Sequence, residues 1–410
     1  MNKLFVFRKI EQVIINYFKP EDVNEIKKIL SQAIDSTGKT FPQLDVEGQM
    51  PGNDFSLSQT QIDLLITYTE NKLSRNKLIE FLLILAETIK TCGYYSAAIN
   101  IFNYLLDVAS DEGKSVSIKI NVYLAIADIY QKQAYWKESL SFIKKARNAF
   151  EELNDRKGIA RCENLLGTLY GEQGNLKKAL SHFEKSLSFL NTSRDSALVG
   201  MLEINLGIIN NIQGNSDQSF TYFQRALVKF EQTHTIYRIA ELRHNLGMLF
   251  SQKGEYDSAL TEFDKSISLS IEAGLLSKLG ISFLGKAVIF IQLKDYSLAA
   301  GFADKAMEIC YNLNDRLSMA DIYKVKGIIE KFRGNLKLAE NYLLTSLRIN
   351  QELSNALNRA ETLSELGFLY IVMGQNNKAL ENFLPALDYF QSINMLGMVH
   401  KLKEAIHQIK

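Results

Sequence analysis

The stretch ENLLGTLYGEQGNLKKALSHFEKSL (residues 163–187) has the pattern of a helix, a glycine turn and a second helix. EINLGIINNIQGNSDQSFTYFQRAL (203–227) and RHNLGMLFSQKGEYDSALTEFDKSI (243–267) repeat this pattern at intervals of 40 residues. Repetition at a fixed period indicates an architecture in which each unit packs on its neighbours. The repeat therefore decides the fold before any single motif is considered.

Each repeat has a small anchor residue, which follows a leucine in most repeats: Ala86, Ala127, Gly167, Gly207, Gly247, Ala287, Gly327 and Gly367. The residue twelve positions later is also small in every repeat, which allows two helices to approach closely. Sixteen positions after the anchor the residue is large in every repeat except at Ala303. Seven positions after it the first helix is expected to end at glycine, with Ala134 and Lys294 as replacements that specify the turn less clearly.

The pattern LG..Y...G....A...F..AL resembles the tetratricopeptide repeat family from residue 76 to about residue 390. The unit of 40 residues is longer than the usual one of about 34. In this respect it is similar to the arrays of the Pins/LGN adaptors and the kinesin light chain. The resemblance implies an all-α fold, a right-handed superhelical solenoid of about eight helix-turn-helix repeats with a concave inner surface.

The sequence predicts four segments. Residues 1–57 form an N-terminal helical segment with an irregular loop, 58–75 a helix leading into the array, 76–392 eight repeats and 393–410 a capping helix. A helical segment before a repeat array also resembles the layout of the Rap-type peptide-sensing regulators of bacteria.

The segment AIDSTGKT (33–40) fits the loose pattern of a phosphate-binding loop. A functional loop of this kind follows a buried strand and begins a helix. Here a helical pattern precedes it, and FPQLDVEGQMPG, which cannot be a helix, follows it. We therefore interpret the segment as a helix end at Gly38, with a hinge after it.

Composition argues against several other classes of function. The 47 basic and 46 acidic residues leave no net charge that would attract nucleic acid or an anionic membrane. There is no apolar run long enough to span a membrane, and three cysteines without a metal-ligand spacing fit a reducing, cytoplasmic location. The positions of the histidines suggest no catalytic or metal site, and we expect no enzyme activity and no cofactor.

The expected binding surface is the inner face of the first helices. In tetratricopeptide repeat proteins, which this sequence resembles, the residue after each anchor usually faces the groove. The resemblance also implies that asparagines two positions before an anchor hydrogen-bond the backbone of an extended peptide. The candidates are Asn164, Thr168, Asn205, Ile208, Ile212, His244, Asn245, Met248, Val288, Ile328, Phe332 and Phe368. A second interpretation is that these side chains only pack against the neighbouring first helix.

Two hypotheses of function follow. The first is a non-enzymatic adaptor that binds a partner peptide or helix in the groove. The alternative is a peptide-sensing regulator whose N-terminal helices act on a second protein.

Overall fold

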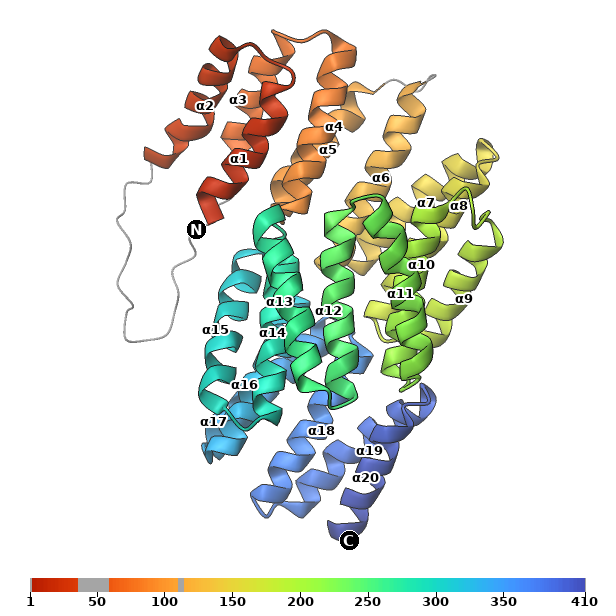
Figure 1. The fold of residues 1–410 in the computed structure, drawn as a ribbon, viewed down its shortest axis with the longest axis vertical. Coiled ribbons are helices and arrows are strands. Elements are labelled where there is room, and N and C mark those ends of the chain that lie inside the picture. The colour runs from red at the N-terminus through yellow and green to blue at the C-terminus, as the bar shows by residue number, and fades with distance from the viewer. Residues whose placement is uncertain (1, 36–58, 110–113, 410) are drawn as a thin grey trace. The chain divides into compact units, whose positions relative to one another are not determined.

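The computed structural model of the chain describes residues 2–35, 59–109 and 114–409, and every regular element in these ranges is an α-helix. Within residues 130–410, Figure 1 shows each helix of a repeat beside the next. They form two compact units, residues 1–129 and 130–410. The expected all-α repeat architecture is confirmed.

The first unit contains α1 (Asn2–Ile15), α2 (Pro20–Asp35), α3 (Gln59–Glu70), α4 (Arg75–Thr91), α5 (Tyr95–Val108) and most of α6 (Lys114–Lys132). Its core forms around Phe81, which is fully buried. The rings of Tyr17 and Phe18 lie edge-on to it, with centroids 5.4 and 5.3 Å away. Most of the AIDSTGKT segment, including Gly38, lies outside the described residues, as does the expected hinge after Gly38.

The second unit consists of six complete helix pairs, each of which is one repeat, with one further helix before them and one after them. Its helices are α7 (Trp136–Glu152), α8 (Arg156–Glu172), α9 (Leu176–Ser188), α10 (Ser196–Ile212), α11 (Ser216–Gln232), α12 (Ile236–Gln252), α13 (Tyr256–Ala273), α14 (Leu276–Gln292), α15 (Tyr296–Asn312), α16 (Arg316–Arg333), α17 (Leu336–Glu352), α18 (Ala356–Val372), α19 (Asn376–Ser392) and α20 (Leu396–Ile409). The even-numbered helices up to α18 are the first helices of their repeats. The last helix, α20, buries Val399, Leu402 and Ile406 and exposes His400 and Lys401.

Within a repeat, the two helices meet where the anchor glycine lies under a large side chain. A β-carbon added at Gly247 would lie 2.7 Å from the ring of Phe263, and one at Gly367 would lie 2.3 Å from the ring of Phe383. No real β-carbon is accommodated at such distances, so only glycine allows these rings to be buried here. Where the anchor is Ala287, the opposing residue is Ala303, and both are fully buried.

The turns are more uniform than the sequence predicts. Six of the expected glycines take positive φ angles, and Ala134 and Lys294 adopt the same conformation with φ of 60° and 61°. A second left-handed residue also recurs between repeats, with φ from 49° to 59°, at Asn154, His234, Asn314, Ser354 and Asn394. Glycine positions do not predict this second set, because asparagine, which occupies three of the five positions, also tolerates positive φ.

Replacing a crowded and an open glycine should have opposite effects on stability. Gly367→Ala would push the new methyl group into the buried Phe383 ring, and overpacking of this kind costs about 1–3 kcal/mol. Gly301→Ala lies in α15 with no atom within 4 Å of the new carbon, so helix propensity should stabilise it by up to about 1 kcal/mol. Urea midpoints monitored by circular dichroism would measure both effects. Equal midpoints for the two variants would contradict this account of the helix spacing.

Candidate functional site

The residues after the anchors are half-buried and pack partly against neighbouring helices. Ile208, Met248, Val288 and Ile328 each contact a cluster of buried apolar side chains. Phe368 lies edge-on to Phe383, with ring centroids 5.0 Å apart. Ile212 also packs partly against a core cluster. These positions therefore contribute to the interface between repeats.

Phe332 is placed differently. Its side chain is 53% exposed, and its ring stacks on Tyr296 at the start of α15, with centroids 5.4 Å apart. It therefore lies beside the turn within a repeat rather than among the polar groups described next.

The two equivalent asparagines have different environments. Asn205 donates from its Nδ2 atom to Asn164 Oδ1 at 3.0 Å and to Thr168 Oγ1 at 3.3 Å. Asn245 Nδ2 is buried and has no hydrogen-bond partner among the described residues. The residues one repeat earlier that would correspond to Asn164 and Thr168 are Ile204 and Ile208, which offer no side-chain acceptor. An unpaired buried donor costs free energy. Asn245, unlike Asn205, would therefore gain a missing hydrogen bond from a ligand.

His244 precedes this amide and is neutral. Burial and, to a smaller extent, the nearby charge of Lys278 lower its pKa to about 3. Its Nδ1 atom lies 3.3 Å from Ser282 Oγ, and its ring lies beside Phe263. His244 therefore contributes hydrogen bonding and packing but no charge near neutral pH.

A group of charged side chains surrounds Tyr237 on α12. Lys278 Nζ lies 5.3 Å from the centre of the Tyr237 ring, and Lys132 Nζ from α6 lies 5.9 Å from it. Glu241 pairs with Arg238 and with Lys278, each at 2.7 Å. Burial raises the pKa of Glu241, but Lys278 and Arg238 lower it more, so its pKa lies well below the usual range. Side chains from α6, α12 and α14 therefore meet at one place, which we call the inner cluster.

Glu172, at the end of α8, adds an acidic group to the inner cluster. Its side chain is exposed, but the surrounding protein atoms and the nearby negative charge of Asp315 together raise its pKa to about 7. Lys278 partly opposes this increase. Among the described residues no ion pair joins Glu172 to a cation, so this carboxyl group could accept a positively charged group from a ligand.

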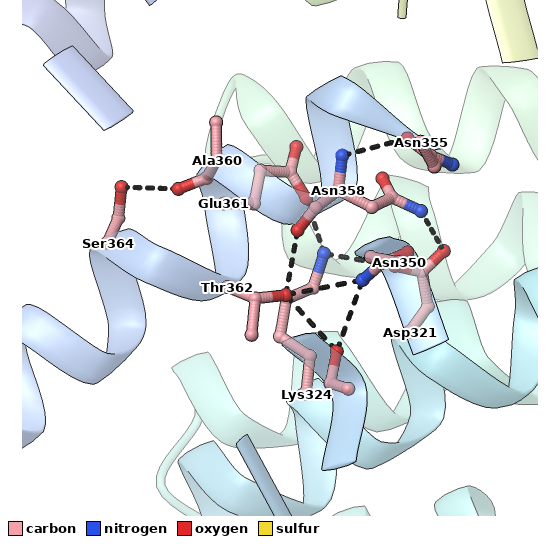
Figure 2. Close-up of polar contacts among 10 residues, drawn as sticks. Asp321, Lys324, Asn350, Asn355, Asn358, Ala360, Glu361, Thr362 and Ser364 are labelled. Carbon is pink, nitrogen blue, oxygen red and sulfur yellow. Dashed lines mark hydrogen bonds and ion pairs between the residues drawn. The ribbon is translucent and has the colours of Figure 1, made fainter. Parts of the chain in front are cut away.

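The inward charges continue along α16 and α18, as Figure 2 shows. Lys324 bonds Asp321 at 3.0 Å and also pairs with Glu361, while Asn358 donates to Asp321 at 3.1 Å. Behind this surface, the fully buried Asn350 donates to Ser346 Oγ at 3.3 Å. The bonds tie α16 to α18, so most of these polar groups already have partners within the protein.

The inner cluster uses repeat positions that the sequence analysis did not select. Glu241, Asp321 and Glu361 stand six residues before their anchors, and Lys132 and Glu172 stand five residues after theirs. Comparing the charged residues at equivalent repeat positions would have indicated this set. Their convergence from distant repeats could not be recognised, because it depends on how the solenoid curves.

Other chemistry has little support among the described residues. No three His, Cys, Asp or Glu side chains there form a group that could hold a metal ion. Cys92, Cys162 and Cys310 are buried thiols, and burial raises the pKa of Cys162 to about 12, which makes it a poor nucleophile. No described helix is long and apolar enough to cross a membrane.

Comparison with known proteins identifies the repeat. A family model described as tetratricopeptide repeat matches residues 119–192 and 198–272. This part of the chain consists of tetratricopeptide repeats. The narrower likeness to the Pins/LGN and kinesin light chain arrays stays a prediction. A search of curated protein sequences finds no match.

Several solved structures share the fold of this chain. A Rap protein complexed with competence and sporulation factor is 12% identical, with a TM-score of 0.59 over 98% of this chain and 100% of the other. The Rap conjugation gene regulator of plasmid pLS20, in complex with the Phr* peptide, is 13% identical, with a TM-score of 0.57 over 98% of both chains. The APC/C hetero-tetramer Cut9–Hcn1 is 15% identical, with a TM-score of 0.56 over 85% of this chain and 59% of the other. At these low identities the likeness shows the fold alone, which is a solenoid of helical repeats.

Replacing Glu172 should change how stability depends on pH. Its folded pKa of about 7 lies above the ordinary glutamate value of 4.5, so the folded state holds an extra proton between these pH values. The free energy of unfolding should therefore fall as pH rises through this range. Glu172→Gln should raise the melting temperature relative to wild type more at pH 8 than at pH 5, because the amide carries no charge.

Differential scanning fluorimetry at both pH values would measure the effect. Glu184→Gln, an exposed change on α9, is the matched control and should leave the two melting temperatures unchanged. An equal gain for Glu172→Gln at both pH values would contradict the raised pKa.

Proposed function

We propose that the protein is a non-enzymatic scaffold that binds an extended partner peptide against the inner cluster and Asn245. The observation that carries the proposal is the Asn245 amide, a buried donor without a partner beside a convergence of charged and aromatic side chains. An extended peptide presents backbone carbonyl oxygens, and one of them could accept from this amide once the Asn245 side chain turns out of its buried position. The same peptide could place an ammonium or guanidinium group near Glu172.

The fold comparison supports this proposal in general terms. Two of the similar structures are Rap proteins, one complexed with competence and sporulation factor and the other with the Phr* peptide. Their low identity to this chain carries over the architecture alone. The choice of ligand-binding residues therefore depends on the contacts of this chain.

Asn245→Ala should weaken peptide binding, whereas Asn205→Ala should not. Peptides selected from a random displayed library against the wild-type protein would serve as probes, and fluorescence anisotropy would measure their affinity. Loss of the Asn245 hydrogen bond should reduce affinity about tenfold, which corresponds to about 1.4 kcal/mol. Asn205 is the matched control because Asn164 and Thr168 already accept its donor.

Circular dichroism would show whether both variants keep their helicity. Equal losses of affinity in the two variants would indicate that the asparagines act only through the packing of the repeats. Peptides whose affinity changes with neither variant would place the binding site elsewhere.

The regulator remains a second candidate, because both Rap alignments extend over 98% of this chain and so include its first unit. In this unit, Ile15 on α1 and Leu64 on α3 are large apolar side chains that are 55% and 50% exposed. Exposed apolar side chains are common individually, but two on a unit separate from the inner cluster offer a surface for a second protein.

The double variant Ile15→Asp, Leu64→Asp should separate the two candidates. A regulator should keep its affinity for the selected peptides and lose a protein partner, because carboxylates cannot be buried in an apolar interface without a large cost. Affinity purification with quantitative mass spectrometry would compare the recovered proteins with those of wild type. Leu344→Asp, at a 44% exposed position on α17, is the control. An unchanged set of partners would favour the simple scaffold.

A further inference from the structure

Some turns within repeats are covered by later repeats of the same unit. We call the turn between the two helices of a repeat its tip, and the turn between consecutive repeats a junction. Trp136 at one tip donates from Nε1 to the carbonyl oxygen of Leu353 at 2.7 Å, although 217 residues separate them. Gln213 at another tip donates to the carbonyl oxygen of Ile393 at 3.3 Å. Tips of early repeats therefore bind junctions of late repeats.

The tip between these two makes the closest contact. Tyr389 donates its hydroxyl group to the carbonyl oxygen of Gly174 at 2.8 Å, and Ala356 donates its backbone N–H to Gln173 at 3.1 Å. A β-carbon at Gly174 would lie 2.7 Å from the backbone nitrogen of Leu357. The junction residues Leu353 and Ile393 are only 5% and 6% exposed. A tip and a junction of this chain are thus complementary surfaces that exclude water.

The corresponding tips of α14–α15, α16–α17 and α18–α19 are uncovered among the described residues. These tips expose large apolar side chains, with exposed fractions from 42% to 59%, at Leu293, Leu298, Phe332, Leu338 and Val372. Two of the tips are continuous, because Phe332 stacks on Tyr296 and Arg333 donates to the carbonyl oxygen of Tyr296 at 2.9 Å. We call these five residues the tip surface.

Early junctions present the complementary surface. Leu153 stands at the same repeat position as the covered Leu353, and Ile236 at the same position as Ala356. Leu153 is nevertheless 56% exposed and Ile236 38% exposed. The second unit already joins early tips to late junctions. It also exposes apolar side chains at its late tips and at its early junctions.

We propose that the tip surface binds the junctions around Leu153 and Ile236 of a second copy of this chain. A second copy is the indicated partner because the contact between early tips and late junctions shows that the two kinds of surface fit each other. The two surfaces differ, so the association is head-to-tail and leaves one tip surface and one set of junctions open at the ends. Further copies can therefore add, and the complex grows with protein concentration. This association uses residues outside the inner cluster and does not depend on peptide binding.

Sedimentation velocity on the full chain at increasing concentration tests the proposal. Wild type should associate, and Phe332→Asp or Leu153→Asp should each weaken association by about 30-fold or more, because each buries a carboxylate in an apolar contact. Leu384→Asp, at a 49% exposed position on α19 away from the tips, is the matched control and should associate like wild type. Circular dichroism would confirm that the three variants keep wild-type helicity.

A mixture of the two interface variants gives the sharpest result. Phe332→Asp keeps its junctions and Leu153→Asp keeps its tip surface, so an equimolar mixture should form dimers and nothing larger. A wild-type protein that stays monomeric at every concentration would overturn the proposal. Association that Phe332→Asp abolishes and Leu153→Asp leaves intact would also overturn it, because two tip surfaces would then bind each other.

Discussion

The close contact between a glycine of one helix and a large side chain of the next is the constraint on which the repeats depend. At Gly207, an added β-carbon would lie 2.5 Å from the Phe223 ring, which is buried only because the glycine has no side chain. The contact fixes the spacing of the two helices in a repeat. Because it recurs along the array, small differences between repeats accumulate into the curvature that determines which distant residues meet.

Curvature has two separate consequences in residues 130–410. On the inner face it brings Lys132, Tyr237 and Lys278 from three repeats to within reach of one another. At the edges it places early tips against late junctions, as in the bond from Tyr389 to Gly174. The residues that meet on the inner face form a surface suited to a ligand. The contacts between tips and junctions stabilise the curvature on which that surface depends.

Most inward charges are already paired within the protein, and this limits where a ligand can gain binding energy. Glu241 and Lys324 each have close partners of opposite charge, so a ligand would have to compete with them. Glu172 and the Nδ2 atom of Asn245 lack such partners among the described residues. Groups without internal partners gain most from a ligand, since binding removes an existing desolvation cost.

The sequence by itself determined the helices, the repeat and its buried positions, because each depends on residues within about 40 positions of one another. It also placed Asn205 and Asn245 on equivalent positions, and it could not distinguish them. Only the tertiary structure did so, since the acceptors for Asn205 come from the preceding repeat and are replaced by isoleucine before Asn245. The inner cluster and the covered tips were likewise decided by the tertiary structure alone, because they join residues whose separation in space depends on the curvature summed over several repeats.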